Sequence, residues 1–329
     1  MMDKLIARFT EQLSEAVELG NAATITKPKS KINKVYVAGL GGSGIGADFV
    51  SAIIRQEAEV PYLVGKGYKI PSYVDKNTLA IISSYSGNTE ETVSSFKQIE
   101  KTGAKIVIIS SGGKLIKAAQ RKKYNYVQVP GDWPSPRACL GYSLVAQLAV
   151  LNKLGLIGEK SLKSISKSVK LIAKESSSIK RSARSIAKKL HNKLPIIYAE
   201  DRIEPVAVRL RQQINENAKT LCWHHVVPEM NHNELVGWKD KDKDLVVLYL
   251  RNTDDYKRNQ IRMDINQKII KKCTPNIINV YSKGTDLVQR MMYLVHLGDW
   301  ISWYLSQLRG QDAIEVNVID YLKGELAKV

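Results

Sequence analysis

The stretch that decides the fold is GLGGSGIGAD, residues Gly39–Asp48, which continues the apolar run KVYVA. A short apolar strand that enters a glycine-rich loop and then a helix is the repeating unit of α/β proteins. Its first six residues fit G-x-G-x-x-G, the fingerprint of loops whose backbone approaches a phosphate at a helix N-terminus. The stretch therefore predicts an α/β fold and raises the question of which phosphate-bearing ligand it faces.

The residues after this loop argue against a dinucleotide. Dinucleotide-binding folds place an acidic residue about 20 positions further on, at the end of the second strand, where it binds the ribose hydroxyls. Here the candidate second strand, PYLVGKGY, leads into Gly65 and Lys66, while Glu57 and Glu59 precede it and Asp48 comes too early. The sequence thus disfavours NAD, and we expect no cofactor.

A second loop carries more information about the ligand. The run LAIISSYSGNTEET, residues 79–92, leads a strand into a helix that Glu90 and Glu91 open, with hydroxyl side chains crowded around Gly87. An ordinary helix cap needs one Ser or Thr, whereas this loop offers several. Backbone N–H groups and hydroxyls at a helix N-terminus suit one anionic group, and the G-K-[ST] pattern of nucleoside-triphosphate loops is not present. The loop predicts a site for a single phosphomonoester.

Strands and helices are expected to alternate in two similar halves, after an N-terminal amphipathic helix with Leu5, Phe9, Leu13 and Val17 on one face. In the first half we expect strands at 35–39, 62–64, 79–83, 105–110 and 126–129, and helices at 45–55, 90–101, 115–119 and 141–153. In the second half we expect strands at 195–199, 245–250 and 276–281, and helices at 204–219, 256–272 and 287–308. Short strands that are apolar on both faces are typical of parallel sheets covered on both sides. The predicted fold class is α/β, with two three-layer α/β/α sandwiches built on parallel sheets.

The bulk composition is that of an ordinary globular protein. The 329 residues are 44% apolar and 25% charged, and no run approaches the roughly 20 apolar residues that span a bilayer. The N-terminus shows no signal-peptide pattern, so we expect no membrane partner and a cytoplasmic location. Three cysteines, Cys139, Cys222 and Cys273, lie far apart and suggest neither a zinc ribbon nor a disulfide framework.

Positive charge is concentrated in one segment. The chain carries a net charge of +18, and residues 153–193 hold twelve Lys or Arg against two Glu. Apolar residues recur there at steps of three, four and seven: Leu162, Ile165, Val169, Ile172, Ile179, Ala183, Ile186 and Leu190. This spacing predicts helices with a solvated basic face, and no aromatic side chains are interleaved for stacking on bases. Nucleic acid is therefore disfavoured as a partner.

Five motifs in order carry a resemblance to a known family. They are the strand–GGSG–helix, the strand–SxSGxT–helix, WPSPRA (133–138), QQINENAK (212–219) and PEMNHNELVGW (228–238). Together they resemble the bifunctional phosphoglucose/phosphomannose isomerases, which are built from tandem sugar isomerase (SIS) domains. The resemblance covers the chain from about Lys34 to its C-terminus. With the composition, it implies an N-terminal helical arm at 1–33, a first phosphosugar-binding SIS domain at 34–155, a basic helical linker at 156–193 and a second SIS domain with a C-terminal helix at 194–329.

The resemblance implies an aldose–ketose isomerase that interconverts glucose 6-phosphate and mannose 6-phosphate with fructose 6-phosphate through an enediolate. It places Ser84, Ser86 and Thr89 on the phosphate of this hexose 6-phosphate. Gly42 and Ser43 would contact the sugar, where glycine permits a close approach of the backbone. The two loops thus receive different roles, one for the sugar and one for its phosphate.

The resemblance also assigns the chemical groups. Glu216, in NEN, is the implied base that moves a proton between C2 and C1, a role that suits a carboxylate with a tuned pKa. Arg137, between Pro134 and Pro136 on one side and Ala138 on the other, would stabilise the enediolate charge. His232, contributed by the neighbouring subunit of a homodimer, and Lys323 would open the sugar ring. Relatives that accept mannose 6-phosphate carry a small hydroxyl residue shortly before this lysine, where this chain reads Val316-Asn317-Val318.

Other interpretations remain open at this point. His224, His225, Glu229 and His232 form a dense group, but Pro228 interrupts any helix that would align them, and no metal site is expected. A non-catalytic phosphosugar-binding regulator usually adds a DNA-binding helix-turn-helix, for which the 33 residues before Lys34 leave no room. An aminosugar-phosphate isomerase is a further alternative, although the glutamine-hydrolysing domain of glucosamine-6-phosphate synthesis is not seen.

Overall fold

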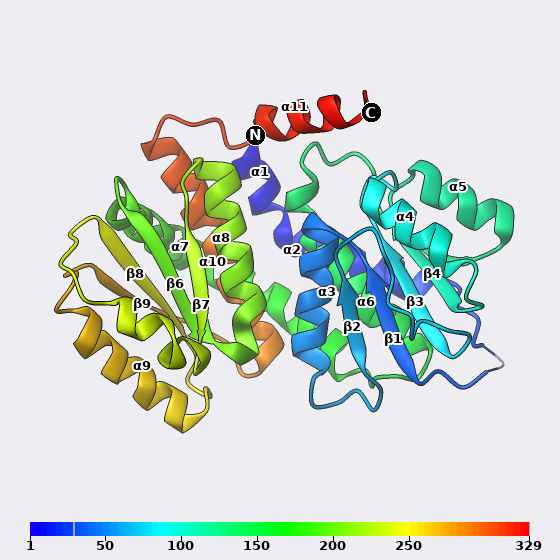
Figure 1. Ribbon diagram of the computed structural model, residues 1–329, viewed down its shortest axis with the longest axis horizontal. Helices are drawn as coiled ribbons and strands as arrows, with labels where there is room; N and C mark the ends of the chain where they lie inside the picture. The colour runs from blue at the N-terminus through cyan, green and yellow to red at the C-terminus, as the bar shows by residue number, and fades with distance from the viewer. Residues whose placement is uncertain (29, 329) are drawn as a thin grey trace. The chain divides into compact units, whose positions relative to one another are not determined.

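The computed structural model describes residues 1–28 and 30–328 and divides them into two compact units (Figure 1). One unit, which we call the N-unit, comprises residues 7–173 and 285–292. The other, the C-unit, comprises residues 1–6, 174–284 and 293–329, of which residue 329 is not described. Within the described residues, no helix is both long and apolar enough to span a membrane.

The N-unit is built on a five-stranded sheet with all neighbours parallel. Its strands are β1 (Lys34–Ala38), β2 (Tyr62–Gly65), β3 (Thr78–Ser83), β4 (Lys105–Ser110) and β5 (Asn125–Gln128), in the order β2-β1-β3-β4-β5. All six residues of β3 are buried, as the apolar run on both faces predicts. Because the strands are parallel, the loops that follow β1 and β3 meet at one edge of the sheet.

Helices cover both faces of this sheet. They are α2 (Phe9–Ala22), α3 (Gly41–Ile54), α4 (Glu90–Ile99), α5 (Gly113–Lys122) and α6 (Leu140–Lys153). On one face Ala80, Ile82 and Ile108 pack with Phe96 of α4 and Leu115 of α5. The other face lies against α3 and α6, which pack on each other, with α2 packed outside α6 (Figure 1).

The C-unit repeats the same topology with four strands. These are β6 (Leu194–Glu200), β7 (Trp223–Val227), β8 (Leu245–Arg251) and β9 (Ile277–Tyr281), all parallel, in the order β7-β6-β8-β9. Strand order therefore equates β6 with β1 and β8 with β3. Its helices are α8 (Glu204–Ala218), α9 (Lys257–Ile270) and α11 (Asn317–Leu326), together with most of α1 (Met2–Ala7) and of α10 (Leu287–Leu308), whose residues 7 and 287–292 belong to the N-unit. Single-turn helices η1 (Pro136–Ala138), η2 (Asp201–Ile203), η3 (Glu229–His232) and η4 (Glu234–Gly237) complete the chain.

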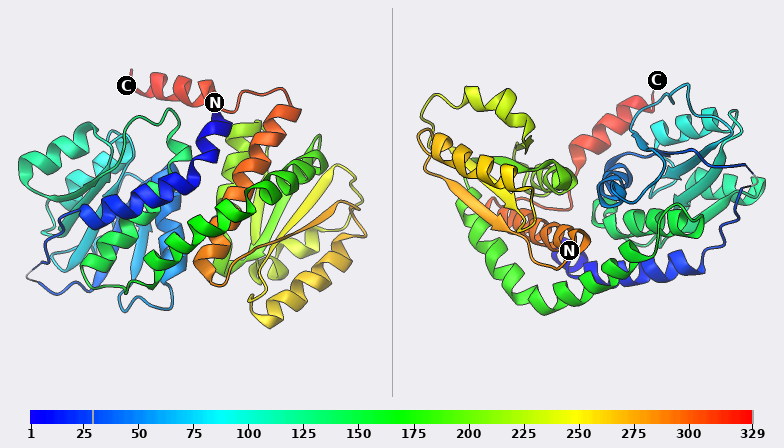
Figure 2. Two further views of the ribbon diagram at one scale, coloured as in Figure 1. Left: turned by 180° about the vertical axis from the view of Figure 1, so that it is seen from behind. Right: turned by 90° about the horizontal axis from the view of Figure 1, so that it is seen from below.

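The basic segment forms one long helix (Figure 2), α7 (Lys160–Leu190), of 31 residues. The division between the units falls within it, between residues 173 and 174. Ile165, Ile172, Ile179 and Leu190 are buried, whereas Leu162 and Val169 are half-buried. The predicted apolar stripe is thus present. The lysines and arginines of α7 lie mainly on the opposite side of this single, unbroken helix.

Three local predictions were wrong. The predicted N-terminal helix is two helices, α1 and α2, that meet at Arg8. The first glycine loop is shorter than expected, because Gly41 to Gly44 already form the first turn of α3. The strand β7 was missed, since its sequence WHHVV begins with three polar or amphipathic residues. The α/β class with two parallel-sheet sandwiches is confirmed.

Candidate active site

The hydroxyl loop, residues 83–89, joins β3 to α4 and collects its side chains by hydrogen bonds. The Ser84 and Thr89 hydroxyl oxygens lie 2.8 Å apart, and Ser84 Oγ also accepts a hydrogen bond from the Gly87 N–H at 3.2 Å. Ser86 Oγ accepts from the Asn88 N–H at 3.3 Å. Ser84 is buried, Thr89 is half-buried and Ser86 is exposed. The three predicted phosphate ligands therefore lie together around Gly87 at the N-terminus of α4.

Gly87 is required by the shape of this loop. Its φ is +67°, and a Cβ added there would lie 1.9 Å from the carbonyl oxygen of Gly112. The loop after β4 supports it from behind, because the Ser111 N–H and hydroxyl both donate to the Tyr85 carbonyl, at 2.9 and 2.6 Å. These contacts fix the backbone of the hydroxyl loop before any ligand arrives, which lowers the entropic cost of binding.

The glycine loop lies beside the hydroxyl loop at the carboxyl edge of the sheet. A Cβ on Gly39 would lie 2.9 Å from the Ser83 carbonyl oxygen, so the ends of β1 and β3 are in close contact. A small cavity of about 40 Å³ opens here, and its lining includes Gly42, Ser43, Ser83, Tyr85, Ser110 and Ser143. Ligands of parallel α/β sheets bind at this edge. The predicted sugar-contacting residues Gly42 and Ser43 thus line a cavity next to the predicted phosphate ligands.

Buried polar groups hold the floor of this cavity. The Ser143 hydroxyl donates to the Ser43 carbonyl at 3.3 Å and accepts from the Gln147 amide at 3.1 Å. The Gln147 side-chain oxygen in turn accepts from the Tyr62 hydroxyl at 2.6 Å. Sequence reasoning missed Ser83, Ser110 and Ser143, although Ser83 and Ser110 each end a predicted strand and so had to reach this edge.

Arg137 lies on η1, in the loop between β5 and α6. A Cβ on Gly42 would lie 3.3 Å from the Pro136 carbonyl oxygen and 3.9 Å from the Arg137 Cα, so this loop passes over the glycine loop. The loop is fastened from α2, where the Gln12 amide donates to the Ala138 carbonyl at 2.8 Å. The N-unit therefore brings together six of the nine predicted site residues.

The position that binds ribose in dinucleotide folds is held by a cation here. Lys66 follows β2, and its ammonium pairs with the Asp48 carboxylate of α3. Burial raises the pKa of Asp48, and the Lys66 ammonium opposes that shift. This lysine–aspartate pair offers no free carboxylate to ribose hydroxyls.

The remaining three residues lie on three elements of the C-unit. Glu216 is in the last turn of α8 and is half-buried. His232 ends η3 and is exposed. Lys323 lies on α11, exposed, with its ammonium 3.9 Å from the Asp320 carboxylate.

A buried polar stripe fixes the rotation of α8 and hence the direction of Glu216. Three α8 residues at steps of four face α10: the Arg209 guanidinium lies 2.8 Å from the Asp299 carboxylate, the Gln213 amide donates to the same carboxylate at 2.9 Å, and the Asn217 amide donates to the Ser302 hydroxyl at 2.8 Å. All these side chains are buried. Glu216 immediately precedes the last of them, so the stripe sets which side of α8 it occupies.

The histidines near His232 have other partners. His225 Nδ1 lies 2.8 Å from the Glu234 carboxylate, which also accepts hydrogen bonds from the Tyr198 hydroxyl and the Trp223 indole. Burial, aided by the positive charge of Arg211, lowers the pKa of His224 to about 4. Among residues 1–28 and 30–328, no three His, Cys, Asp or Glu side chains are grouped as metal ligands. Sequence reasoning missed Glu234. Its position two residues after His232 could have indicated that it lies near the histidines.

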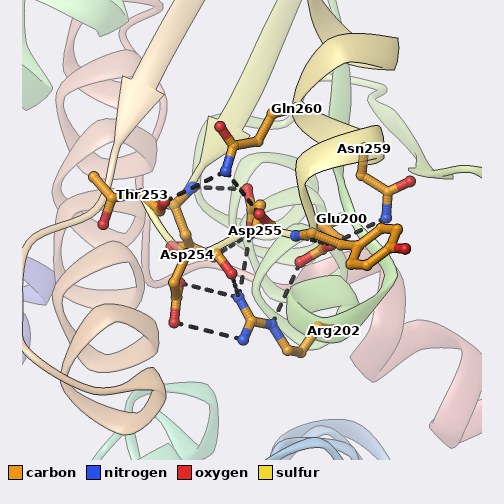
Figure 3. A network of polar contacts seen from close by, with 9 residues as sticks. Glu200, Arg202, Thr253, Asp254, Asp255, Asn259 and Gln260 are labelled. Atoms are coloured by element: carbon orange, nitrogen blue, oxygen red, sulfur yellow. Dashed lines mark hydrogen bonds and ion pairs between the residues drawn. The ribbon is translucent and has the colours of Figure 1, made fainter.

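In the C-unit, the ends of β6 and β8 correspond to the glycine loop and the hydroxyl loop of the N-unit. Side chains at these two strand ends form hydrogen bonds and ion pairs with each other (Figure 3). Arg202, just after β6, lies 3.4 Å from the Glu200 carboxylate and 3.0 Å from the Asp254 carboxylate in the loop after β8. Glu200 also accepts from the Tyr256 N–H at 2.7 Å and the Asn259 amide at 3.0 Å. Acidic side chains paired with Arg202 therefore occupy the edge of the sheet where the N-unit has hydroxyls.

Comparison with known proteins agrees with this fold. Residues 30–155 match the SIS domain family, and residues 179–326 match the bacterial phospho-glucose isomerase C-terminal SIS domain. Among solved structures, the C-terminal domain of glucosamine-fructose-6-phosphate aminotransferase from Francisella tularensis superposes with a TM-score of 0.76 at 15% identity, covering 95% of this chain and 97% of that chain. The fold is thus that of the tandem SIS-domain proteins.

Two curated relatives show which family of tandem SIS-domain proteins the chain belongs to. The bifunctional phosphoglucose/phosphomannose isomerase of Caldicellulosiruptor bescii is 38% identical over all of this chain and 99% of its own length. The enzyme of the same name from Aquifex aeolicus is 34% identical over 92% of this chain and 93% of its own length. The chain belongs to the bifunctional phosphoglucose/phosphomannose isomerase family, and the resemblance carried by its motifs is confirmed.

Proposed function

We propose that this chain is an aldose–ketose isomerase that interconverts glucose 6-phosphate, and also mannose 6-phosphate, with fructose 6-phosphate. The observation that carries the proposal is the hydroxyl loop, in which Ser84 and Thr89 gather around Gly87 at a helix N-terminus beside a cavity. Full-length relatives that bear this activity in their names support it. The loop has the donors for a phosphomonoester, and the cavity beside it is lined by the predicted sugar-contacting residues Gly42 and Ser43.

In the proposed mechanism one group of the predicted site residues binds the substrate and another moves protons. Ser84, Ser86 and Thr89 donate to the phosphate of the substrate, while Gly42 and Ser43 face the sugar. The Glu216 carboxylate takes the proton from C2 of the opened aldose, which leaves an enediolate. A proton passes from O2 to O1, and Glu216 returns its own proton to C1 to give the ketose. The reaction moves hydrogen within one molecule, so no redox cofactor takes part in it.

The other charged residues complete the proposal. The Arg137 guanidinium stabilises the negative charge of the enediolate, because a fixed cation interacts more strongly with the intermediate than with the neutral sugar. His232 and Lys323 open the ring before proton transfer. We propose that the active site is completed in a homodimer, with His232 supplied by the neighbouring subunit, and that the enzyme works in the cytoplasm.

The test is turnover by the purified chain of glucose, mannose and fructose 6-phosphates, with unphosphorylated fructose as the comparison. We expect isomerisation of the phosphorylated sugars, unchanged by a chelator, and a Ser84→Ala variant with a raised KM for fructose 6-phosphate. Ser94→Ala is the matched control. It removes a half-buried hydroxyl one turn into α4 that donates to the Tyr68 carbonyl at 3.1 Å. Tight binding without turnover would instead indicate a regulator, turnover of aminosugar phosphates alone would indicate an aminosugar isomerase, and loss of activity with chelator would indicate a metal.

A further inference from the structure

Lys219 closes the end of α8 in an unusual way. It is the first residue after the helix, in the left-handed conformation with φ of +53°. Its side chain turns back, and the ammonium donates to the Glu216 carbonyl at 2.6 Å. A cation at this position also interacts favourably with the negative end of the helix dipole.

The same ammonium reaches a second segment of the chain. It donates to the Glu315 carbonyl at 2.6 Å and to the Asp312 carbonyl at 3.0 Å, and lies 3.7 Å from the Glu315 carboxylate. Three carbonyl oxygens therefore use the three N–H donors of one ammonium. A lysine side chain that is only 25% exposed and fully hydrogen-bonded holds its partners more rigidly than a solvated one.

The second segment leads directly into α11. The Asn317 N–H, at the first position of α11, donates to the Glu315 carboxylate, and the Ile314 N–H donates to the Asp312 carboxylate at 2.8 Å. Arg309, at the end of α10, adds a parallel tie through its Nε–H, which donates to the Ala218 carbonyl at 2.9 Å. The end of α8 and the start of α11 are thus joined through the side chain of Lys219.

We propose that Lys219 is a positioning residue, a clamp that holds the α8 turn bearing Glu216 and the segment leading to Lys323 in one fixed arrangement. The proposal rests on the proposed function for the roles of Glu216 and Lys323. Lys219 touches backbone carbonyls and a carboxylate rather than the substrate, so it acts through the two residues it fastens. Misplacing a catalytic group by about 1 Å is enough to slow turnover roughly 100-fold.

The experiment compares two variants. Lys219→Met keeps the length of the side chain but removes its N–H donors. Lys219→Gln keeps two N–H donors, so it still tests the proposal if Lys219→Met does not fold. Lys193→Met is the matched control, because Lys193 also donates to a carbonyl, that of Lys243 at 2.8 Å, at the opposite, amino end of β6. We expect kcat to fall roughly 10- to 100-fold in Lys219→Met with KM changed less than about threefold, and a smaller fall in Lys219→Gln. We expect the control to keep wild-type kinetics.

Two further readouts separate a clamp from a general structural role. Amide hydrogen exchange of residues 312–326 is expected to accelerate in Lys219→Met, with exchange in the N-unit unchanged. Adding Lys219→Met to Lys323→Met is expected to lower kcat by less than the product of the two single effects, because both act on one step.

Unchanged hydrogen exchange in residues 312–326, or effects on kcat that multiply fully, would overturn the clamp. A wild-type chain that turns over no hexose phosphate would overturn the proposed function instead, and the exchange result would still decide whether Lys219 fastens the segment.

Discussion

At the scale of single residues, the hydroxyl loop depends on one glycine. Gly87 combines a positive φ with a neighbouring carbonyl that leaves no room for a side chain. We predict that Gly87→Ala raises the KM for fructose 6-phosphate at least about 10-fold. The added Cβ forces the loop to move, which displaces the hydroxyl groups of Ser84, Ser86 and Thr89. Gly67→Ala is the control, since a Cβ there meets nothing within 4 Å and the φ is not positive. Steady-state kinetics decide, and a Gly87→Ala enzyme with the wild-type KM would show that the loop does not hold the phosphate.

The residue scale also shows where sequence reasoning reaches its limit. Ser84, Ser86 and Thr89 were identifiable because several hydroxyls around one glycine exceed what a helix cap needs. Lys219 and Asp299 carried no such signal, because a lysine after a helix and an aspartate within one are most often solvated. Their roles depend on partners about 90 positions away in the chain, which only the folded structure brings into contact.

At the scale of elements, the packing of α8 on α10 rests on a buried ion pair. The Arg209 and Asp299 side chains are 4% and 6% exposed, so removing one partner leaves an uncompensated buried charge. We predict that Asp299→Ala lowers the free energy of unfolding by about 3–5 kcal/mol. Asp264→Ala removes the 58%-exposed partner of Arg251 and is expected to cost about 0–1 kcal/mol. Urea unfolding measures both, and equal losses would contradict a special role for the α8–α10 stripe.

The carboxylate network of the C-unit predicts a pH dependence. Burial, together with the neighbouring Glu200 carboxyl, raises the pKa of Asp255 from its ordinary value of 3.8 to about 7. Between these two values the folded state binds more protons than the unfolded state, so this group lowers stability as pH rises from about 4 to about 7. Asp255 is also faced by Arg202 and by Asn252, whose N–H and amide donate to it.

The test uses Asp255→Asn, whose amide imitates the protonated acid as a donor to Glu200. We predict that the variant gains stability relative to the wild type as pH rises from 5 to 8, since it carries no carboxyl to ionise. Urea unfolding at the two pH values gives the difference. If the stability difference between the variant and the wild type is the same at both pH values, or favours the wild type more at pH 8, Asp255 does not take up a proton on folding in this range.

Elements were predicted where the physical signal was local. The run LAIIS of β3 is apolar on both faces and bounded by turn residues, and it was found at nearly its true limits. The strand β7 was missed because Trp223, His224 and His225 obscure its apolar residues, and it is recognised as a strand only through its pairing with β6. The separation of α1 from α2 at Arg8 was likewise not visible in a continuous amphipathic pattern.

At the scale of the whole molecule, the proposed site contains residues from two copies of the chain. We predict that mixing the inactive variants Glu216→Gln and His232→Ala under conditions that exchange subunits restores activity to about a quarter of the wild-type level. Random pairing makes half of the dimers mixed, and each mixed dimer has one site with both wild-type residues. If both residues come from one chain, every site keeps a defect and no activity returns.

The most direct test of the central claim follows the hydrogen that Glu216 is proposed to move. The isomerisation of fructose 6-phosphate in D₂O, monitored by NMR, is predicted to place deuterium at C2 of the glucose 6-phosphate formed by the wild type. Glu216→Gln is predicted to lose this exchange by roughly 10²- to 10⁴-fold while binding 6-phosphogluconate with little change in Kd. Deuterium exchange at the wild-type rate in Glu216→Gln would contradict the account.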